Sequence, residues 1–175
     1  ILQLRGKPTV VDQDDGATAE SRPPTLNDLL TLCRELNERN AKYVVIGGMA
    51  MIQAGFVRGT EDIDLLIEAS PANQATVLKA LEILPDKAVT ELREGDLERY
   101  VVVRVADEIV VNLLLSAGGI RFAEAQPEGT VVEVADVPIP FASPRLLLQM
   151  KQTGSEKDML DLLFLRELLS HPRPD

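Results

Sequence analysis

Two aspartates are the residues best suited to chemistry: Asp62 and Asp64, in an apolar stretch that follows a Gly47-Gly48 pair. The stretch is typical of a strand, and side chains two apart on a strand project from the same face. Two like charges held this close repel each other unless a cation lies between them, and hard oxygen ligands at this spacing suit Mg²⁺ or Mn²⁺. The spacing therefore predicts a divalent metal site.

The glycine pair lies between a short apolar strand, 43–46, and a helical segment expected from about Met49 to Gln53. A glycine turn that opens a helix presents unpaired backbone N–H groups, and these favour an anion together with the helix dipole. Beside a metal site with two carboxylates, such a turn predicts a metal-bound phosphate.

Read together, these residues follow the form GG-x9-R-x-T-x-D-x-D-L, which starts at Gly47 and includes Arg58, Thr60, Asp62 and Asp64. This string resembles the signature of the DNA polymerase β-type nucleotidyltransferase superfamily, most closely its small bacterial branch, which includes abortive-infection type toxins. The resemblance implies an α+β fold with a mixed sheet flanked by helices and followed by C-terminal helices. It also implies that the two acids hold Mg²⁺ (or Mn²⁺) and an NTP triphosphate over the glycine turn.

Two residues of the loop before the aspartates have roles that the string leaves open. The guanidinium of Arg58 suits bidentate contact with a phosphate, and an ion pair with Glu61 or another neighbour is the alternative. Thr60 is expected to fix the loop by a hydrogen bond to the backbone.

Near the C-terminus, LLLQMKQTGSEKDMLDLLFL resembles a second pattern of the same branch, a Lys followed by K-D-x-x-D-L. By that likeness Lys151 contacts the triphosphate and Asp158 orients it or the site, with Asp161 on the same helix face. Ser155 stands where an Arg is common, which removes one phosphate contact. By residue type alone, a solvated lysine and a polar helix face fit equally.

The chain departs from the superfamily pattern at Asn112, in VVNLLL, where a third carboxylate is usual. An amide offers one carbonyl oxygen and no base, whereas a carboxylate can ligate a metal and take a proton. Neither nearby acid replaces it, because Asp107 lies on the opposite face and Glu108 lies roughly 13 Å along the strand. We therefore expect nucleotide binding to survive better than catalysis, since the triphosphate oxygens supply much of one ion's coordination.

The sequence divides into an N-terminal arm or linker (1–24), a nucleotidyltransferase-like core (25–142), a C-terminal helical segment packed on the core (143–170) and a tail (171–175). An arm or edge strand is expected at 1–11 and a mobile linker at 11–24. Two β-hairpins are expected, at 100–115 and 130–141. Helices are expected after Thr25 with a capping box to Asp28, after Ser70-Pro71, over Ile120 to Gln126, over Arg145 to Lys151, and from near Ser155.

The amino-acid composition limits the classes of function that fit this chain. A chain of 175 residues with 45% hydrophobic content fits one domain with a sizeable core. A net charge of −10 disfavours an extended nucleic-acid surface, because such binding depends on Lys and Arg contacts to phosphate. A single cysteine, Cys33, excludes an internal disulfide, fits a reducing cytoplasm and is expected to be a buried apolar residue. No membrane span is expected, and the only histidine, His171, builds no catalytic dyad or zinc site.

These observations predict a cytoplasmic, Mg²⁺-dependent nucleotidyltransferase that moves a nucleoside monophosphate from an NTP to a hydroxyl acceptor. The acceptor is an RNA end, a protein or a small molecule, and the resemblance implies a cognate antitoxin or other protein partner. The alternative is a nucleotide-binding or interaction protein of the same fold whose catalysis is impaired by Asn112. A chain altered at this residue to trap substrate is the third reading.

Overall fold

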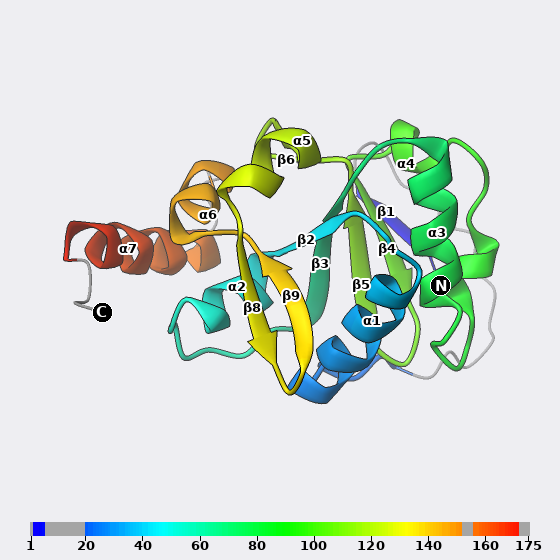
Figure 1. Ribbon diagram of the computed structural model, residues 1–175, viewed down its shortest axis with the longest axis horizontal. Coiled ribbons are helices and arrows are strands. Elements are labelled where there is room, and N and C mark those ends of the chain that lie inside the picture. The colour runs from blue at the N-terminus through cyan, green and yellow to red at the C-terminus, as the bar shows by residue number, and fades with distance from the viewer. Residues whose placement is uncertain (1, 6–19, 152–155, 172–175) are drawn as a thin grey trace.

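The computed structural model describes residues 2–5, 20–151 and 156–171. The linker predicted before Glu20, Ser155 and most of the predicted tail lie outside these residues. The described chain forms a mixed sheet with helices around it (Figure 1), which confirms the predicted α+β fold class.

The main sheet has seven strands in the order β1-β4-β5-β3-β2-β9-β8. The pairs β3–β5 and β2–β9 are parallel, and the other neighbours are antiparallel. Both predicted hairpins form, as β4–β5 and β8–β9. The strands are β1 Leu2–Arg5, β2 Tyr43–Ile46, β3 Asp62–Ile67, β4 Val102–Ala106, β5 Val110–Leu114, β8 Thr130–Val134 and β9 Val137–Phe141, with β6 Ser116–Ala117 and β7 Ile120–Arg121 in a separate two-stranded sheet.

Three helices, α1, α3 and α6, begin where a side-chain cap satisfies a first free N–H group. Thr25 and Asp28 form the predicted capping box of α1, and the hydroxyls of Ser70 and Ser143 accept from the first turns of α3 and α6. The helices are α1 Leu26–Glu38, α2 Gly47–Gln53, α3 Pro71–Leu81, α4 Asp96–Arg99, α5 Phe122–Ala125, α6 Pro144–Met150 and α7 Glu156–Ser170, with 3₁₀ turns η1 Ala88–Glu91 and η2 Gln126–Glu128.

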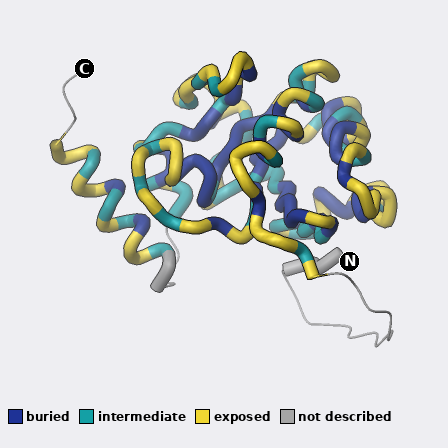
Figure 2. Tube along the Cα trace, turned by 90° about the horizontal axis from the view of Figure 1, so that it is seen from below, coloured by how far each residue is buried: buried dark blue, intermediate teal, exposed yellow. Residues whose placement is uncertain are grey.

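Helices α1 and α3 pack against each other and cover one face of the sheet, and α7 packs on α6 at the far end (Figure 1). Strand β3 alternates: Ile63, Leu65 and Ile67 are fully buried, while Asp62 and Asp64 point to the other face. Buried residues run continuously through the centre of the domain (Figure 2). The apolar face therefore anchors β3, and the two aspartates lie together on its opposite face.

Cys33 is fully buried on α1, as predicted for an apolar core residue. Burial raises the pKa of its thiol to about 12. The thiolate needed for nucleophilic chemistry is thus disfavoured at neutral pH.

Two predicted helix boundaries are wrong. Residue Ile120 pairs with Ala117 in a short hairpin, and the helix begins only at Phe122, where Glu124 accepts from the N–H of Arg121 at 3.0 Å. Helix α2 begins at Gly47 itself rather than near Met49, because this glycine adopts a φ of +62° that turns the chain from β2 into the helix.

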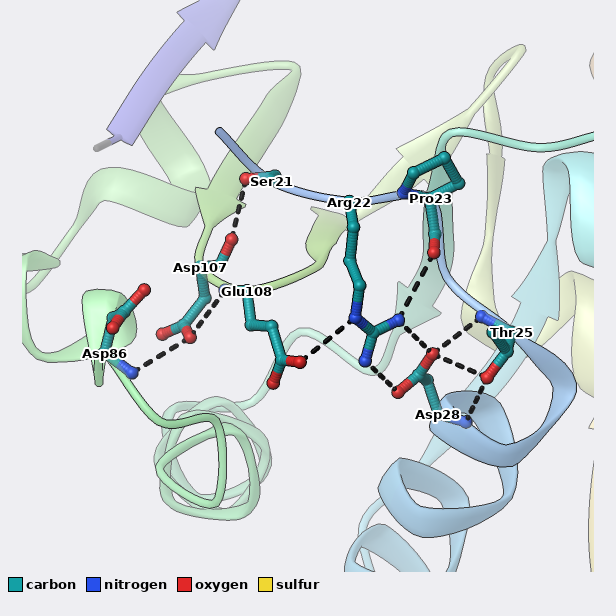
Figure 3. A network of polar contacts seen from close by, with 8 residues as sticks. All are labelled: Ser21, Arg22, Pro23, Thr25, Asp28, Asp86, Asp107 and Glu108. Atoms are coloured by element: carbon teal, nitrogen blue, oxygen red, sulfur yellow. Dashed lines mark hydrogen bonds and ion pairs between the residues drawn. The ribbon is translucent and has the colours of Figure 1, made fainter. Parts of the chain in front are cut away.

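Residues 21 and 22 are anchored, which corrects their assignment to a mobile linker (Figure 3). The hydroxyl of Ser21 donates to the carbonyl of Asp107 at 2.7 Å, and Arg22 forms ion pairs with Glu108 at 3.0 Å and Asp28 at 2.7 Å. The guanidinium lowers the pKa of the Asp28 carboxyl well below its usual range. The turn between β4 and β5 is thereby tied to the start of α1.

Candidate functional site

The centre of the site is a contact between the neighbouring parallel strands β3 and β5. Asp64 and Asn112 are register partners, and Asp62 precedes on the same face of β3. The amide nitrogen Nδ2 of Asn112 donates to Oδ2 of Asp62 at 3.0 Å and to Oδ1 of Asp64 at 2.8 Å. One nitrogen reaches both carboxylates, so both side chains project from the same face toward one point, as their spacing predicted.

The glycine pair lies directly against this centre. A Cβ at Gly47 would collide with the carboxylate of Asp64, and a Cβ at Gly48 would lie 2.7 Å from the Cβ of Thr60. Only glycine therefore allows the start of α2 to approach the aspartate strand so closely. Thr60 fixes the loop as expected, because its hydroxyl donates to the backbone carbonyl of Asp62 at 3.0 Å.

A cationic side chain that the sequence analysis missed, Arg104, lies beside the aspartates. It is the register partner of Asn112 on β4, and its Nη1 is 3.6 Å from Oδ2 of Asp62. A charged residue in the middle of the apolar stretch VVRVA was the available signal. The turn predicted at residues 106–108 lies at 107–109. A turn centred one residue too early does not place Arg104 opposite Asn112.

Four charged residues form a second cluster, which we call the loop–helix cluster: Arg58, Lys151, Asp158 and Asp161. Oδ2 of Asp161 accepts from Arg58 at 3.1 Å and from Lys151 at 2.7 Å, and Lys151 also contacts Asp158 at 3.3 Å. Asp161 is completely buried. The cluster joins the loop after α2 to the C-terminal end of α6 and the first two turns of α7.

The loop–helix cluster shows the ion-pair partners of its two cations. Arg58 forms an ion pair, and its partner is Asp161 rather than Glu61. Lys151 is not a solvated lysine, since only 14% of its side chain is exposed. A Cβ at Gly48 would lie 3.4 Å from Nη2 of Arg58, so the guanidinium lies at the start of α2. The rings of Phe56 and Phe164 stack with centroids 4.7 Å apart and hold the same loop to α7.

Whether the centre fits a metal ion can be judged from Asn112. Within residues 2–5, 20–151 and 156–171, no group of three or more His, Cys, Asp or Glu side chains could hold a metal. The carbonyl oxygen Oδ1 of Asn112 is buried and has no hydrogen-bond partner among the described residues. With the amide in this position, the carboxylates of Asp62 and Asp64 supply the hard-oxygen ligands, and this pair suits one Mg²⁺ or Mn²⁺.

Comparisons with known proteins assign the fold. No protein-family model matches the sequence, and no curated protein sequence matches it. The lincosamide antibiotic adenylyltransferase LnuA, solved with lincomycin bound, is 16% identical with a TM-score of 0.57, over 84% of this chain and 99% of that one. The antibiotic-resistance factor ANT(2'')-Ia, solved in solution, is 15% identical with a TM-score of 0.55, over 81% and 82%.

A third solved structure, an antigenic nucleotidyltransferase-like protein from Paracoccidioides brasiliensis, is 18% identical with a TM-score of 0.54, over 83% of this chain and 78% of that one. These likenesses show that the chain has a nucleotidyltransferase-type fold. At such low identity they show the fold alone, and the small bacterial branch remains a prediction. Among the described helices, none has the length and apolar character needed to cross a membrane.

Proposed function

We propose that this protein is a Mg²⁺-dependent nucleotidyltransferase that moves a nucleoside monophosphate from an NTP to a hydroxyl acceptor. The observation that carries this proposal is the convergence of Asp62 and Asp64 on one point beside Gly47. Two carboxylates held this close in a fold of this type suit a divalent cation shared with a triphosphate.

Each residue of the site then has a defined task. Asp62 and Asp64 hold the cation, which neutralises charge on the triphosphate when bound. The backbone N–H groups at Gly47 and Gly48 face the phosphates. Arg58 and Lys151 supply positive charge beside them and exchange part of their contact with Asp161 for phosphate oxygens.

The remaining carboxylate of the cluster, Asp158, orients Lys151, which it contacts at 3.3 Å. Transfer forms a bond from the acceptor oxygen to the α-phosphorus and breaks the bond to pyrophosphate. The acceptor's proton cannot go to Asn112, because a neutral amide is no base. We propose that water takes it.

An amine-bearing small molecule, which is cationic at neutral pH, fits the chain's net charge of −10. Two structures of similar fold are antibiotic-directed proteins by name, which supports a small-molecule acceptor over an RNA end or a protein. ATP is the first nucleotide to test, since LnuA is an adenylyltransferase. A cytoplasmic location and a cognate antitoxin remain proposals, and the antitoxin rests on the sequence resemblance alone.

The second candidate is nucleotide binding without turnover. The observation that favours it is the position of the Asn112 amide, which donates to both carboxylates without a metal ion and offers no base. In this case the chain keeps the nucleotide site as a sensor or interaction module.

One assay separates the two functions. The protein is incubated with each α-labelled NTP, Mg²⁺ or Mn²⁺, and a panel of aminoglycosides, lincosamides and short RNAs. Label transfer by the native chain that is lost in Asp62→Asn, and kept in the control Asp136→Asn on the β8–β9 turn, supports the enzyme. Nucleotide binding with no transfer, and transfer gained by Asn112→Asp, supports the second candidate.

A further inference from the structure

Three neighbouring strands place one row of polar side chains across the site. Arg104 on β4 is the register partner of Asn112 on β5, and Asn112 is the register partner of Asp64 on β3. Partners across strands share a face of the sheet, so the guanidinium, the amide and the carboxylate stand side by side. Asp62 closes the group, 3.6 Å from Arg104 and 3.0 Å from Asn112.

The charge of this group differs from that of a site built on three carboxylates. Asp62 and Asp64 are the two anions, Asn112 is neutral and Arg104 is cationic, so the four side chains carry a formal charge of −1. Three carboxylates at this point would need far more positive charge to hold them together. In this chain, part of that charge is built into β4.

Arg104 contacts Asp62, the first of the two aspartates. Its Nη1 contacts the same atom, Oδ2 of Asp62, that accepts from Asn112, so both groups hold Asp62 from the β5 side. The side chain of Arg104 is one third exposed, so part of it is accessible to solvent beside Asp62. A second divalent cation bound on that side would meet a positive charge and a neutral amide.

We propose that this is a one-metal site, in which the guanidinium of Arg104 and the amide of Asn112 take the place of a second divalent cation beside Asp62. The inference rests on the proposed nucleotide site, and it adds Arg104 as a positioning residue for Asp62. Arg104 holds the carboxylate in place by charge, and Asn112 does so by hydrogen bonding.

The test counts metal ions on the full chain. Mn²⁺ is titrated in the presence of a saturating, non-hydrolysable ATP analogue, and free Mn²⁺ is followed by electron paramagnetic resonance. We expect one Mn²⁺ per protein–nucleotide complex for the native chain and for the control Arg99→Gln on α4. The double variant Arg104→Gln/Asn112→Asp is expected to bind two.

Two ions on the native chain would overturn the one-metal inference while leaving the proposed function intact. No nucleotide-dependent Mn²⁺ at all would overturn both. The number of Mn²⁺ ions bound by the native chain is measured without any variant. This number can therefore overturn the inference even if the double variant does not fold.

A second measurement separates a charge role of Arg104 from a scaffold role. Without nucleotide, Arg104→Gln removes a positive charge next to the metal position, so its affinity for Mn²⁺ should rise about tenfold, and Arg104→Lys should restore the native affinity. If Arg104 only supports the strand, Arg104→Gln weakens Mn²⁺ binding and lysine does not restore it. That result would overturn the inference.

Discussion

The amide of Asn112 donates to Oδ1 of Asp64 at 2.8 Å across two parallel strands that the chain places in register. The same nitrogen donates to Asp62, so a single neutral group separates two carboxylates. A carboxylate in its place would add a third negative charge.

Asn112→Asp should make stability depend on metal. The substitution replaces two hydrogen bonds to charged groups, each worth about 1.5–3 kcal/mol, with repulsion among three carboxylates. Without divalent ions the melting temperature should fall by several degrees, at about 2–4 °C per kcal/mol for a chain of this size. Mg²⁺ or Mn²⁺ should recover most of the loss. The exposed control Asn27→Asp should show no metal-dependent shift, and an equal response of the two variants would contradict the account.

Asp161→Asn should destabilise the fold strongly. Asp161 is buried and pairs with both Arg58 and Lys151, whose side chains are 15% and 14% exposed. Removing one member of a buried ion cluster costs about 3–5 kcal/mol, because the partner charges remain buried. Urea unfolding measures the change, with Asp136→Asn as the control. A loss below about 0.5 kcal/mol would mean that the loop–helix cluster does not hold α7 to the loop.

The same variant has a second expected property. Without the carboxylate of Asp161, Arg58 loses this ion pair and Lys151 keeps its contact with Asp158. Inorganic triphosphate should therefore stabilise Asp161→Asn more than the native chain. Thermal melts with and without triphosphate compare the two proteins. Equal shifts would show that these two cations do not meet phosphate.

Gly48→Ala should destabilise through crowding rather than through backbone conformation. A Cβ at this position meets Thr60, whereas a Cβ at Gly59 meets nothing within 4 Å. Overpacking of this kind costs about 1–3 kcal/mol, so Gly48→Ala should lower the free energy of unfolding and Gly59→Ala should leave it near the native value. Urea unfolding of the matched pair is the measurement. Equal stability of the two variants would place Thr60 farther from α2 than the structure has it.

The contact of Arg22 with Asp28 should produce an acid-dependent loss of stability. Hydrogen bonds from Arg22 lower the folded-state pKa of Asp28 below its ordinary value of 3.8. A lowered carboxyl pKa contributes stability above the unfolded-state value, and this contribution disappears as pH falls below about 3.8 toward the folded-state pKa. Arg22→Gln should therefore melt lower than the native chain at pH 7, and the difference should shrink below pH 4. Arg145→Gln, an exposed control, should show no such convergence.

The sequence predicted the parts of the fold that follow local rules. Apolar runs separated by short turns predicted the hairpins, and the hydroxyls of Thr25, Ser70 and Ser143 predicted three helix starts. The two aspartates share a face as their spacing required. The helix predicted from Ile120 failed because a short pairing with Ala117, only three residues away, competes with helix formation there.

The features that sequence reasoning missed depend on contacts between distant segments. Arg104 reaches Asp62 only because β4, β5 and β3 are neighbours in the sheet. This strand order cannot be predicted from the sequence around either residue. The partner of Arg58 lies 103 residues away, in α7. Arg22 was assigned to a linker because its segment is polar, yet it meets Glu108, 86 residues further on. Local patterns assigned the candidate site residues to strands, helices and loops. Contacts between distant segments determine which of these residues lie together.

The most direct test of the central claim is nucleotide binding at the paired aspartates. A non-hydrolysable ATP analogue is added with Mg²⁺ at about 100 times its dissociation constant, as measured by calorimetry, and the stabilisation of the native chain is recorded. We expect about 2.7 kcal/mol, and we expect binding to be lost in Asp62→Asn and Asp64→Asn but kept in Asp136→Asn. Binding that persists unchanged in the two site variants, or no binding of any NTP by the native chain, would contradict the account.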